Sequence, residues 1–330
     1  MSKTVLFHEL GGPEVMRLED VAVGEPGPGE ARIKVEAIGL NRAEVLFRTG
    51  RYIEPVRGFP ARLGTEAAGV IEAVGEGVTQ FRPGQPVSIL PGLFSQNDYG
   101  VYAERAIVPA SAVVDRGEIG PVEGAAVWMP YVTAYGALVQ VGGMRPGDTV
   151  VLNAASSSVG LAAIQVAERI GARPIALTRS ADKKAALLKE GAAEVIVTES
   201  EDVAERVMAV TGGRGAEFVF DAIAGPGVTE LAKVIADGGT HLVYGWLSGE
   251  PTPFPLLDLG MPPVNMRTYT IRETNRSPER LRQAHAFVTS GLRTGVLRPV
   301  VDRVFDLADI VAAHRHLESN TQIGKIVATV

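Results

Sequence analysis

The hydrophobic and polar positions of this chain follow two different rhythms. Up to about residue 125, short runs rich in valine and isoleucine alternate with glycine and proline turns, as in 31–40 "ARIKVEAIGL" and 66–75 "EAAGVIEAVG". Such runs predict an irregular β-rich segment. From about 128, strand-length apolar runs alternate with helical patterns, beginning with 149–155 "TVVLNAA" and 157–172 "SSVGLAAIQVAERIGA". This alternation predicts parallel strands with right-handed crossovers, that is, a doubly wound sheet.

The alternation can be followed to the end of the chain. Strands and helices are expected in turn over 173–178, 181–192, 194–197, 201–212, 216–223, 227–238 and 240–246. The tail from about 273 predicts a helix, an extended segment, a helix and a closing strand over 277–291, 298–307, 307–319 and 324–330. The fold class is therefore α/β.

Composition restricts the class of protein. With 330 residues, 46% hydrophobic and 21% charged, the chain fits a globular protein of two domains. A net charge of −6 without a basic stripe argues against nucleic acid as a partner. The sequence shows neither a long apolar run nor a targeting pattern, so we expect no membrane association and a cytoplasmic location. The absence of cysteine excludes disulfides, thiolate nucleophiles and Cys-ligated metals.

The turn 153–160, "NAASSSVG", lies where a dinucleotide-binding protein has its glycine-rich loop. Its spacing is that of the fingerprint, with small residues in place of two glycines. A helix N-terminus after a parallel strand binds anions through free N–H groups, and serine hydroxyls can add donors. The alternative is a tight turn with a plain serine N-cap. The residues expected around a pyrophosphate are Ala154, Ser156, Ser157, Ser158, Val159 and Gly160.

The end of the second strand discriminates between cofactors. An NAD site places a carboxylate there for the ribose 2′-hydroxyl, whereas a 2′-phosphate requires cations. This chain has Thr178, Arg179 and Ser180, followed by Lys183. These residues favour NADP(H); the alternative is a solvated basic loop.

The chain as a whole resembles the medium-chain dehydrogenase/reductase superfamily, in its zinc-independent quinone oxidoreductase (zeta-crystallin-like) branch. The similarity rests on the order and spacing of "GGPEV", "VEAIGLNRAEVLFRTGRY", "LGTEAAGVIEAVGEGV", "VTAYGAL", "MRPGDTVVLNAASSSVG", "FDAIAG" and "GKIVATV". The resemblance implies a GroES-like catalytic domain formed by 1–127 and 273–330, with a Rossmann NADP(H)-binding domain, 128–272, inserted between its two parts.

The resemblance also allows the metal ligands to be checked by position. Zinc-dependent relatives have Cys-His where this chain has Asn41-Arg42, Gly-His-Glu at 64–66, and a later Cys at Met129. Only Glu66 is retained, which does not make a tetrahedral N/S site. His314 and His316 are two residues apart on an expected helix and are taken as surface residues. We therefore expect no metal.

Without a Lewis acid, reduction of an isolated carbonyl loses transition-state stabilisation. A quinone or an α,β-unsaturated carbonyl delocalises the charge that hydride delivery leaves, so hydrogen-bond donors suffice. The matching family positions are Asn41, whose amide would donate to the substrate oxygen, and Tyr52, whose hydroxyl would donate and supply a proton. The alternatives are a loop cap for Asn41 and a rim aromatic for Tyr52. Arg48 and Glu66 are weaker candidates.

On the cofactor side, the resemblance places Thr133 and Gly245 near the nicotinamide. Trp246 and the run 254–263, "FPLLDLGMPP", either shape the pocket or pack in a core or dimer contact. The family pairs an edge strand of its nucleotide domain across a homodimer, for which 265–271 is the candidate.

The leading hypothesis is an NADPH-dependent, zinc-independent oxidoreductase that transfers hydride to a quinone or an enone. The first alternative is an enoyl-thioester reductase. The second is a nucleotide-binding protein of the same fold with little turnover.

Overall fold

The computed structural model describes residues 1–255 and 264–330. The chain divides into two compact units, 1–129 with 299–330 and 130–298. The sequence placed the second boundary at 273. The unit that holds the parallel sheet extends further because α10 packs within it, where Phe287 stacks on Tyr135 and lies under the Arg169 guanidinium.

The first unit is β-rich, as its short valine and isoleucine runs predict. A small sheet has the order β2-β1-β4, and a larger sheet has the order β15-β16-β3-β5-β6-β8, with β7 also paired to β3. The elements are β1 (Ser2–Phe7), η1 (Pro13–Val15), β2 (Met16–Val21), β3 (Glu30–Gly39), α1 (Arg42–Arg48), β4 (Ala61–Arg62), β5 (Ala67–Val74), β6 (Pro86–Ile89), α2 (Gln96–Tyr99), β7 (Arg105–Pro109), η2 (Ala110–Ala112), β8 (Val113–Asp115), α3 (Pro121–Gly124), β15 (Val301–Asp306), η6 (Leu307–Asp309), α11 (Ile310–Ser319) and β16 (Lys325–Thr329).

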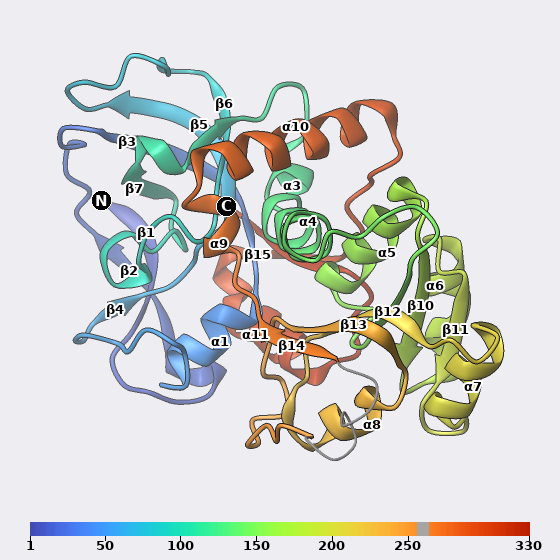
Figure 1. Ribbon diagram of the computed structural model, residues 1–330. Coiled ribbons are helices and arrows are strands. Elements are labelled where there is room, and N and C mark those ends of the chain that lie inside the picture. Colours follow the sequence, from blue (N-terminus) through green and yellow to red (C-terminus); the bar gives the residue numbers. More distant parts are fainter. Residues whose placement is uncertain (256–263) are drawn as a thin grey trace. The chain divides into compact units, whose positions relative to one another are not determined.

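The C-terminal tail completes this first sheet. Strand β16 pairs antiparallel with β3, with Val327 opposite Gly39, so the red end of the chain joins the blue N-terminal strands (Figure 1). The pairing buries one apolar core that includes Ile33, Phe47 and Ile326. It also places the first residue of β16 beside the loop between β3 and α1.

The second unit is the predicted doubly wound sheet. Its six parallel strands have the order β11-β10-β9-β12-β13-β14, so the strand order reverses between β9 and β12. Its elements are α4 (Trp128–Tyr135, whose first two residues belong to the first unit), η3 (Gly136–Val141), β9 (Thr149–Leu152), α5 (Ser158–Ile170), β10 (Arg173–Thr178), η4 (Ala181–Lys183), α6 (Lys184–Lys189), β11 (Glu194–Val197), α7 (Val203–Val210), β12 (Ala216–Asp221), η5 (Gly225–Gly227), α8 (Val228–Ala232), β13 (Ile235–Val243), β14 (Asn265–Thr268), α9 (Arg272–Asn275) and α10 (Pro278–Thr294).

One expected helix is shorter than the sequence pattern indicated. The pattern predicted a helix over 227–238, but α8 ends at Ala232 and β13 already begins at Ile235. Gly238, with φ of 73°, adopts a left-handed conformation that does not continue a helix, and a register shift in the pairing of β12 with β13 accommodates it.

No helix among the residues that the structure describes is both long enough and apolar enough to cross a membrane. The cytoplasmic location stays a prediction.

Candidate functional site

The turn after β9 keeps the backbone geometry of a glycine-rich turn. Ala154 has φ of 46°, in the left-handed region that glycine reaches without strain. A Cβ on Gly160 would lie 2.5 Å from the Ala155 carbonyl oxygen, so α5 packs against the turn closely enough to require glycine there. Ala154 and Gly160 thus retain the two functions of fingerprint glycines, a left-handed backbone and a close approach.

The first turn of α5 is suited to an anion. The Ser157 hydroxyl caps the helix by accepting from the Gly160 amide at 3.1 Å. The amides of Ser158 and Val159 precede the first hydrogen bond within the helix, so they and the helix dipole can act on a phosphate. The N-cap function of Ser157 and anion binding are therefore compatible.

The basic loop after β10 contacts this turn. The Lys183 ammonium donates to the Ser156 hydroxyl over 3.0 Å, joining two segments that the sequence singled out separately. Arg179 is exposed, and Ser180 caps the η4 turn with its hydroxyl. The Thr178 hydroxyl donates to the Ser180 carbonyl oxygen at 3.2 Å. The loop thus holds a cation, Lys183, in contact with the turn before α5, which is the arrangement that a ribose 2′-phosphate requires.

A buried polar network lies where the strand order reverses, the place where doubly wound sheets bind ligands. Asp221, at the end of β12, accepts hydrogen bonds from Asn153 Nδ2, His241 Nε2 at 3.0 Å and the Ala224 amide at 2.9 Å. Asn153 Oδ1 accepts from the Ala222 amide at 2.8 Å. Burial acts to raise the pKa of Asp221, but these hydrogen bonds outweigh it, so its pKa lies below the usual range. The network fixes the loop that follows β12.

The remaining expected cofactor residues lie in the same unit. Gly245 follows β13, and a Cβ there would lie 2.5 Å from the Ala222 carbonyl oxygen. Thr133 is buried in α4. Trp246 is 37% exposed and donates from Nε1 to the Glu250 carbonyl oxygen. Most of the run 254–263 lies outside the described residues.

In the first unit, Asn41 belongs to a buried charged cluster. Lys325 Nζ lies 2.6 Å from Asn41 Oδ1 and 2.6 Å from Glu66 Oε2. The other Glu66 oxygen accepts from the Met129 amide at 2.7 Å. Asn41 Nδ2 donates to the Gly39 carbonyl oxygen at 3.1 Å and, more weakly, to Glu66 at 3.4 Å. Because β16 pairs with β3, Lys325 reaches the loop that holds Asn41.

A second carboxylate completes the cluster. Glu44, in the first turn of α1, accepts from the Thr65 hydroxyl and the Asn41 amide, each at 2.8 Å. Its side chain is fully buried. Burial raises the pKa of Glu44 to about 7, while the Thr65 hydrogen bond and the Lys325 charge oppose the rise.

The other candidates of this unit are placed as follows. Tyr52 is half-buried, and its ring packs edge-on against Phe47 at 6.3 Å. Arg48 is buried and donates to Glu318 and to the Gly11 carbonyl oxygen. The Arg48 guanidinium therefore joins α1 to α11 and serves the fold.

The expectation for one histidine is wrong. His316 is partly exposed, but His314 is fully buried, with Nε2 3.3 Å from the Tyr102 hydroxyl. Residues two apart on a helix do face different directions, and one of these directions is the core. Burial and the charges of Arg48 and Arg42 lower the pKa of His314 to about 3, so the imidazole is neutral in the folded protein.

The buried acid Glu44 predicts a pH dependence of stability. The pKa of Glu44 rises from 4.5 to about 7 on folding. Between these two pH values, the native state holds a proton that the unfolded state has lost. Its contribution to the free energy of unfolding should therefore fall as pH rises from about 4.5 to about 7, by roughly 3 kcal/mol. We expect Glu44→Gln to remove this fall, so that the free energy of unfolding, variant minus wild type, increases from pH 5 to pH 8 in urea titrations.

His314 provides the control, because its depressed pKa acts in the opposite direction. Its contribution to stability is lost as pH falls below about 6.5. The free energy of unfolding of His314→Gln, minus that of the wild type, should therefore increase toward low pH. A constant Glu44→Gln difference across this range would contradict the raised Glu44 pKa.

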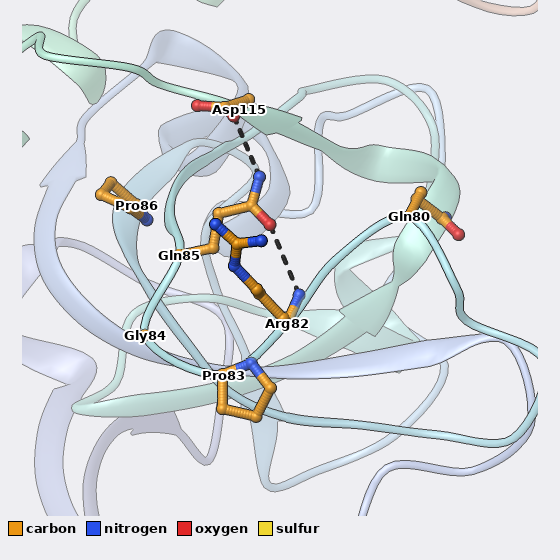
Figure 2. A pocket seen from close by; sticks show the side chains of 7 residues that line it. All are labelled: Gln80, Arg82, Pro83, Gly84, Gln85, Pro86 and Asp115. Atoms are coloured by element: carbon orange, nitrogen blue, oxygen red, sulfur yellow. Dashed lines mark hydrogen bonds between the residues drawn. The ribbon is translucent and has the colours of Figure 1, made fainter.

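A shallow surface pocket adjoins the β5–β6 turn (Figure 2). Its polar groups bond to one another, since the Gln85 side chain donates to Asp115 at 2.9 Å and accepts from the Arg82 amide at 3.4 Å. No residue that the sequence singled out lines it; the lining residues are Gln80, Arg82, Pro83, Gly84, Gln85, Pro86 and Asp115.

Comparison with known proteins agrees with this geometry. The alcohol dehydrogenase GroES-like domain matches residues 27–118, and the zinc-binding dehydrogenase family matches residues 158–290. A quinone oxidoreductase of Pseudomonas aeruginosa is 33% identical over 333 residues, covering 99% of both chains. The chain belongs to the medium-chain dehydrogenase/reductase superfamily, in its quinone oxidoreductase branch.

Other members of the superfamily extend the comparison. A 2-haloacrylate reductase of a Burkholderia species is 30% identical and covers 99% of this chain and 98% of its own. The structure of Escherichia coli quinone oxidoreductase complexed with NADPH has a TM-score of 0.92 at 27% identity, covering 100% of both chains. These matches confirm the predicted GroES-like and Rossmann domains.

The zinc site of other superfamily members has no counterpart in the cluster around Asn41. The matching positions offer an amide, a hydroxyl and a thioether, and the one carboxylate, Glu66, already binds the Lys325 ammonium. An ammonium in contact with the only retained ligand repels a divalent cation. No group of three or more histidine, cysteine, aspartate or glutamate residues suited to a metal occurs within 1–255 and 264–330. The donor set therefore does not fit zinc.

Sequence reasoning assigned no chemistry to Lys325, Glu44 or Asp221. Two of them carried a signal: Lys325 begins an otherwise apolar strand, "GKIVATV", and Asp221 ends the apolar strand of "FDAIAG". A charged residue at the end of a buried strand requires a partner, and that requirement could have directed attention to both.

Proposed function

We propose that this protein is an NADPH-dependent oxidoreductase that transfers hydride, without a metal, to a quinone or an α,β-unsaturated carbonyl compound. The observation that carries the proposal is the buried cluster in which Lys325 Nζ contacts Asn41 and Glu66, two positions that match zinc-ligand positions of zinc-dependent relatives. The branch membership established above supports the class of reaction.

The chemistry of the acceptor follows from this cluster. Bound NADPH would supply the hydride. The acceptor oxygen then becomes negatively charged, as an enolate or a phenolate, and the charge is spread over the conjugated system. Hydrogen-bond donors in a dry site can stabilise such an anion. An isolated ketone or aldehyde gives a localised alkoxide and would be a poor substrate.

We assign the donor function to Asn41 and Tyr52. Asn41 Nδ2 contacts Glu66 only at 3.4 Å, so the N–H that points there is weakly bound and can be shared with an acceptor oxygen. The Tyr52 ring is held against Phe47 in the same unit, and its hydroxyl is proposed to donate to the same oxygen and to supply the proton.

The cofactor assignment rests on the second unit. We propose that the α5 N-terminus binds the pyrophosphate and that Arg179, Ser180 and Lys183 bind the 2′-phosphate. The contact between Lys183 and Ser156 supports a shared phosphate site. The proposal also includes Thr133 and Gly245 beside the nicotinamide.

The test is a panel of quinones, enones, 2-haloacrylates, enoyl thioesters and simple aldehydes, followed by oxidation of NADPH with and without a chelator. We expect turnover of conjugated acceptors, little turnover of simple aldehydes and no effect of the chelator. Turnover restricted to enoyl thioesters would favour that alternative. Quenching of NADPH fluorescence without turnover of any acceptor would favour a binding protein, and loss of activity with the chelator would refute the metal-free proposal.

We further propose a homodimer formed through β14, the edge strand next to β13. The Tyr269 amide donates to Val243 of β13, so by alternation the amides of Met266 and Thr268 point away from the sheet toward a partner strand. Thr268→Pro removes one such donor. Light scattering should show a dimer of the 34.8 kDa chain for the wild type and a shift toward monomer for the variant. A wild-type monomer at all concentrations would refute the proposal.

A further inference from the structure

We propose that Lys325 is a positioning residue that fixes the Asn41 amide with its nitrogen as the donor to the acceptor oxygen, and that it supplies there the positive charge that zinc supplies in zinc-dependent relatives. This inference rests on the proposed function and extends it to a residue to which the sequence assigned no role. It is carried by the contacts of Lys325 within the first unit.

The first argument is geometric. An amide side chain can turn over and exchange its oxygen and nitrogen. Lys325 Nζ, which only donates, lies 2.6 Å from Asn41 Oδ1 and therefore determines that the oxygen points to the ammonium. Asn41 Nδ2 must then face the Gly39 carbonyl oxygen at 3.1 Å and Glu66 at 3.4 Å. Lys325 thus determines that this end of the amide is the nitrogen, and its N–H with only the long contact to Glu66 is the one proposed to be shared with the acceptor oxygen.

The second argument concerns charge. The cluster holds a fully buried carboxylate, Glu66, next to the amide that would donate to a developing oxyanion. Unbalanced carboxylates would oppose the formation of negative charge there. Lys325 is 1% exposed and contacts Glu66 directly, so it offsets this charge at short range where solvent screens little.

The third argument is steric. A Cβ on Gly39 would lie 2.8 Å from Lys325 Cε and 3.0 Å from Glu66 Oε2, so the space beside the lysine chain is closely filled. Arginine at 325 would need more room than the cluster offers. The position accepts a linear chain that ends in a single ammonium, which allows a chemical test.

The chain has no cysteine, so Lys325→Cys introduces a unique thiol. Alkylation of the denatured variant with 2-bromoethylamine, followed by refolding, restores a side chain with the length and charge of lysine. Iodoacetamide gives a neutral chain of similar length as the matched control. If refolding fails, Lys325→Met can be purified without chemical modification and compared with the wild type, since methionine is a neutral chain of similar length.

We expect kcat to fall at least about 30-fold in Lys325→Met and in the carbamidomethylated protein, and to recover at least about tenfold in the aminoethylated protein. The dissociation constant of NADPH, measured by fluorescence, should stay within about twofold, because the proposed phosphate contacts belong to the second unit. General unfolding would weaken NADPH binding as well, so it would not give a lower kcat with an unchanged dissociation constant.

Two further variants separate positioning from stability. Arg116→Met removes another buried cation of the first unit, one paired with Glu36 at 2.8 Å, and should lower the melting temperature without changing kcat. The double variant Glu66→Gln with Lys325→Met removes both members of the buried ion pair and should be more stable than Lys325→Met alone. Its kcat should stay low, because the amide introduced at position 66 would favour the turned-over Asn41.

The outcomes are distinct from those that decide the proposed function. Wild-type protein that reduces no conjugated acceptor refutes the function and this inference with it. Active wild-type protein whose Lys325 variants lose only stability and keep kcat overturns this inference and leaves the function standing. Full recovery of kcat in the double variant would overturn it as well.

Discussion

Replacing Asn41 with leucine should lower kcat for quinones and enones by about 100-fold to 1000-fold, the loss typical for one donor to a developing oxyanion. Leucine has nearly the shape of asparagine and cannot donate. The backbone amide of residue 41, which donates to the Glu44 carboxyl group at 2.8 Å, is unchanged. The KM for NADPH should change little. Steady-state kinetics with one quinone and one enone measure both quantities.

A matched control for this variant is Gln322→Met, which removes another buried amide of the first unit. It should affect the melting temperature and leave kcat unchanged. Equal kcat values for Asn41→Leu and wild type, with both proteins folded, would refute the donor function of Asn41 and favour the structural alternative of a loop cap.

Replacing Arg179 with alanine should raise the dissociation constant for NADPH by about 10-fold to 100-fold, the effect of removing a hydrogen-bonded cation from a phosphate. The dissociation constant for NADH should stay within about twofold, because NADH has no 2′-phosphate. The exposed side chain has no part in the core, so the variant should fold normally. Fluorescence titrations with both nucleotides give the ratio directly.

Arg173→Ala is the control, because Arg173 is an exposed arginine at the opposite end of β10. The variant also removes one positive charge, but at the end of β10 that is distant from Arg179. It should therefore leave the preference for NADPH over NADH unchanged. Equal weakening of NADPH and NADH by Arg179→Ala would refute the assignment of the 2′-phosphate. An unchanged dissociation constant for NADPH in Arg179→Ala would favour the alternative of a solvated basic loop.

The sequence predicted the doubly wound sheet well because its signals are local. Strand β9, the turn and α5 follow one another within 149–170, and the N-cap Ser157 and C-cap Gly171 both lie at the ends of the apolar pattern. The basic loop after β10 is likewise a local feature of the sequence, and its function stays a prediction. Periodicity, caps and turn residues act over a few positions, so a single sequence displays them.

The domain boundary and the end of α8 were predicted less well, since packing decides them. The sequence pattern after 273 resembles a connection back to the β-rich unit, but Phe287 of α10 stacks on Tyr135, which keeps the helix with the parallel sheet. No periodicity indicates which of two cores an amphipathic helix will cover.

By itself, the sequence indicated the two kinds of domain, the turn between β9 and α5, the basic loop after β10 and the substitution of the zinc ligands. Only the tertiary structure decided what replaced those ligands. Lys325 and Asn41 are separated by 284 positions and meet because β16 pairs with β3. The lowered pKa of His314 and the raised pKa of Glu44 likewise depend on burial and on side chains that are distant in the sequence. Such effects depend on which distant side chains exclude water from a group, and that information exists only once the chain has folded.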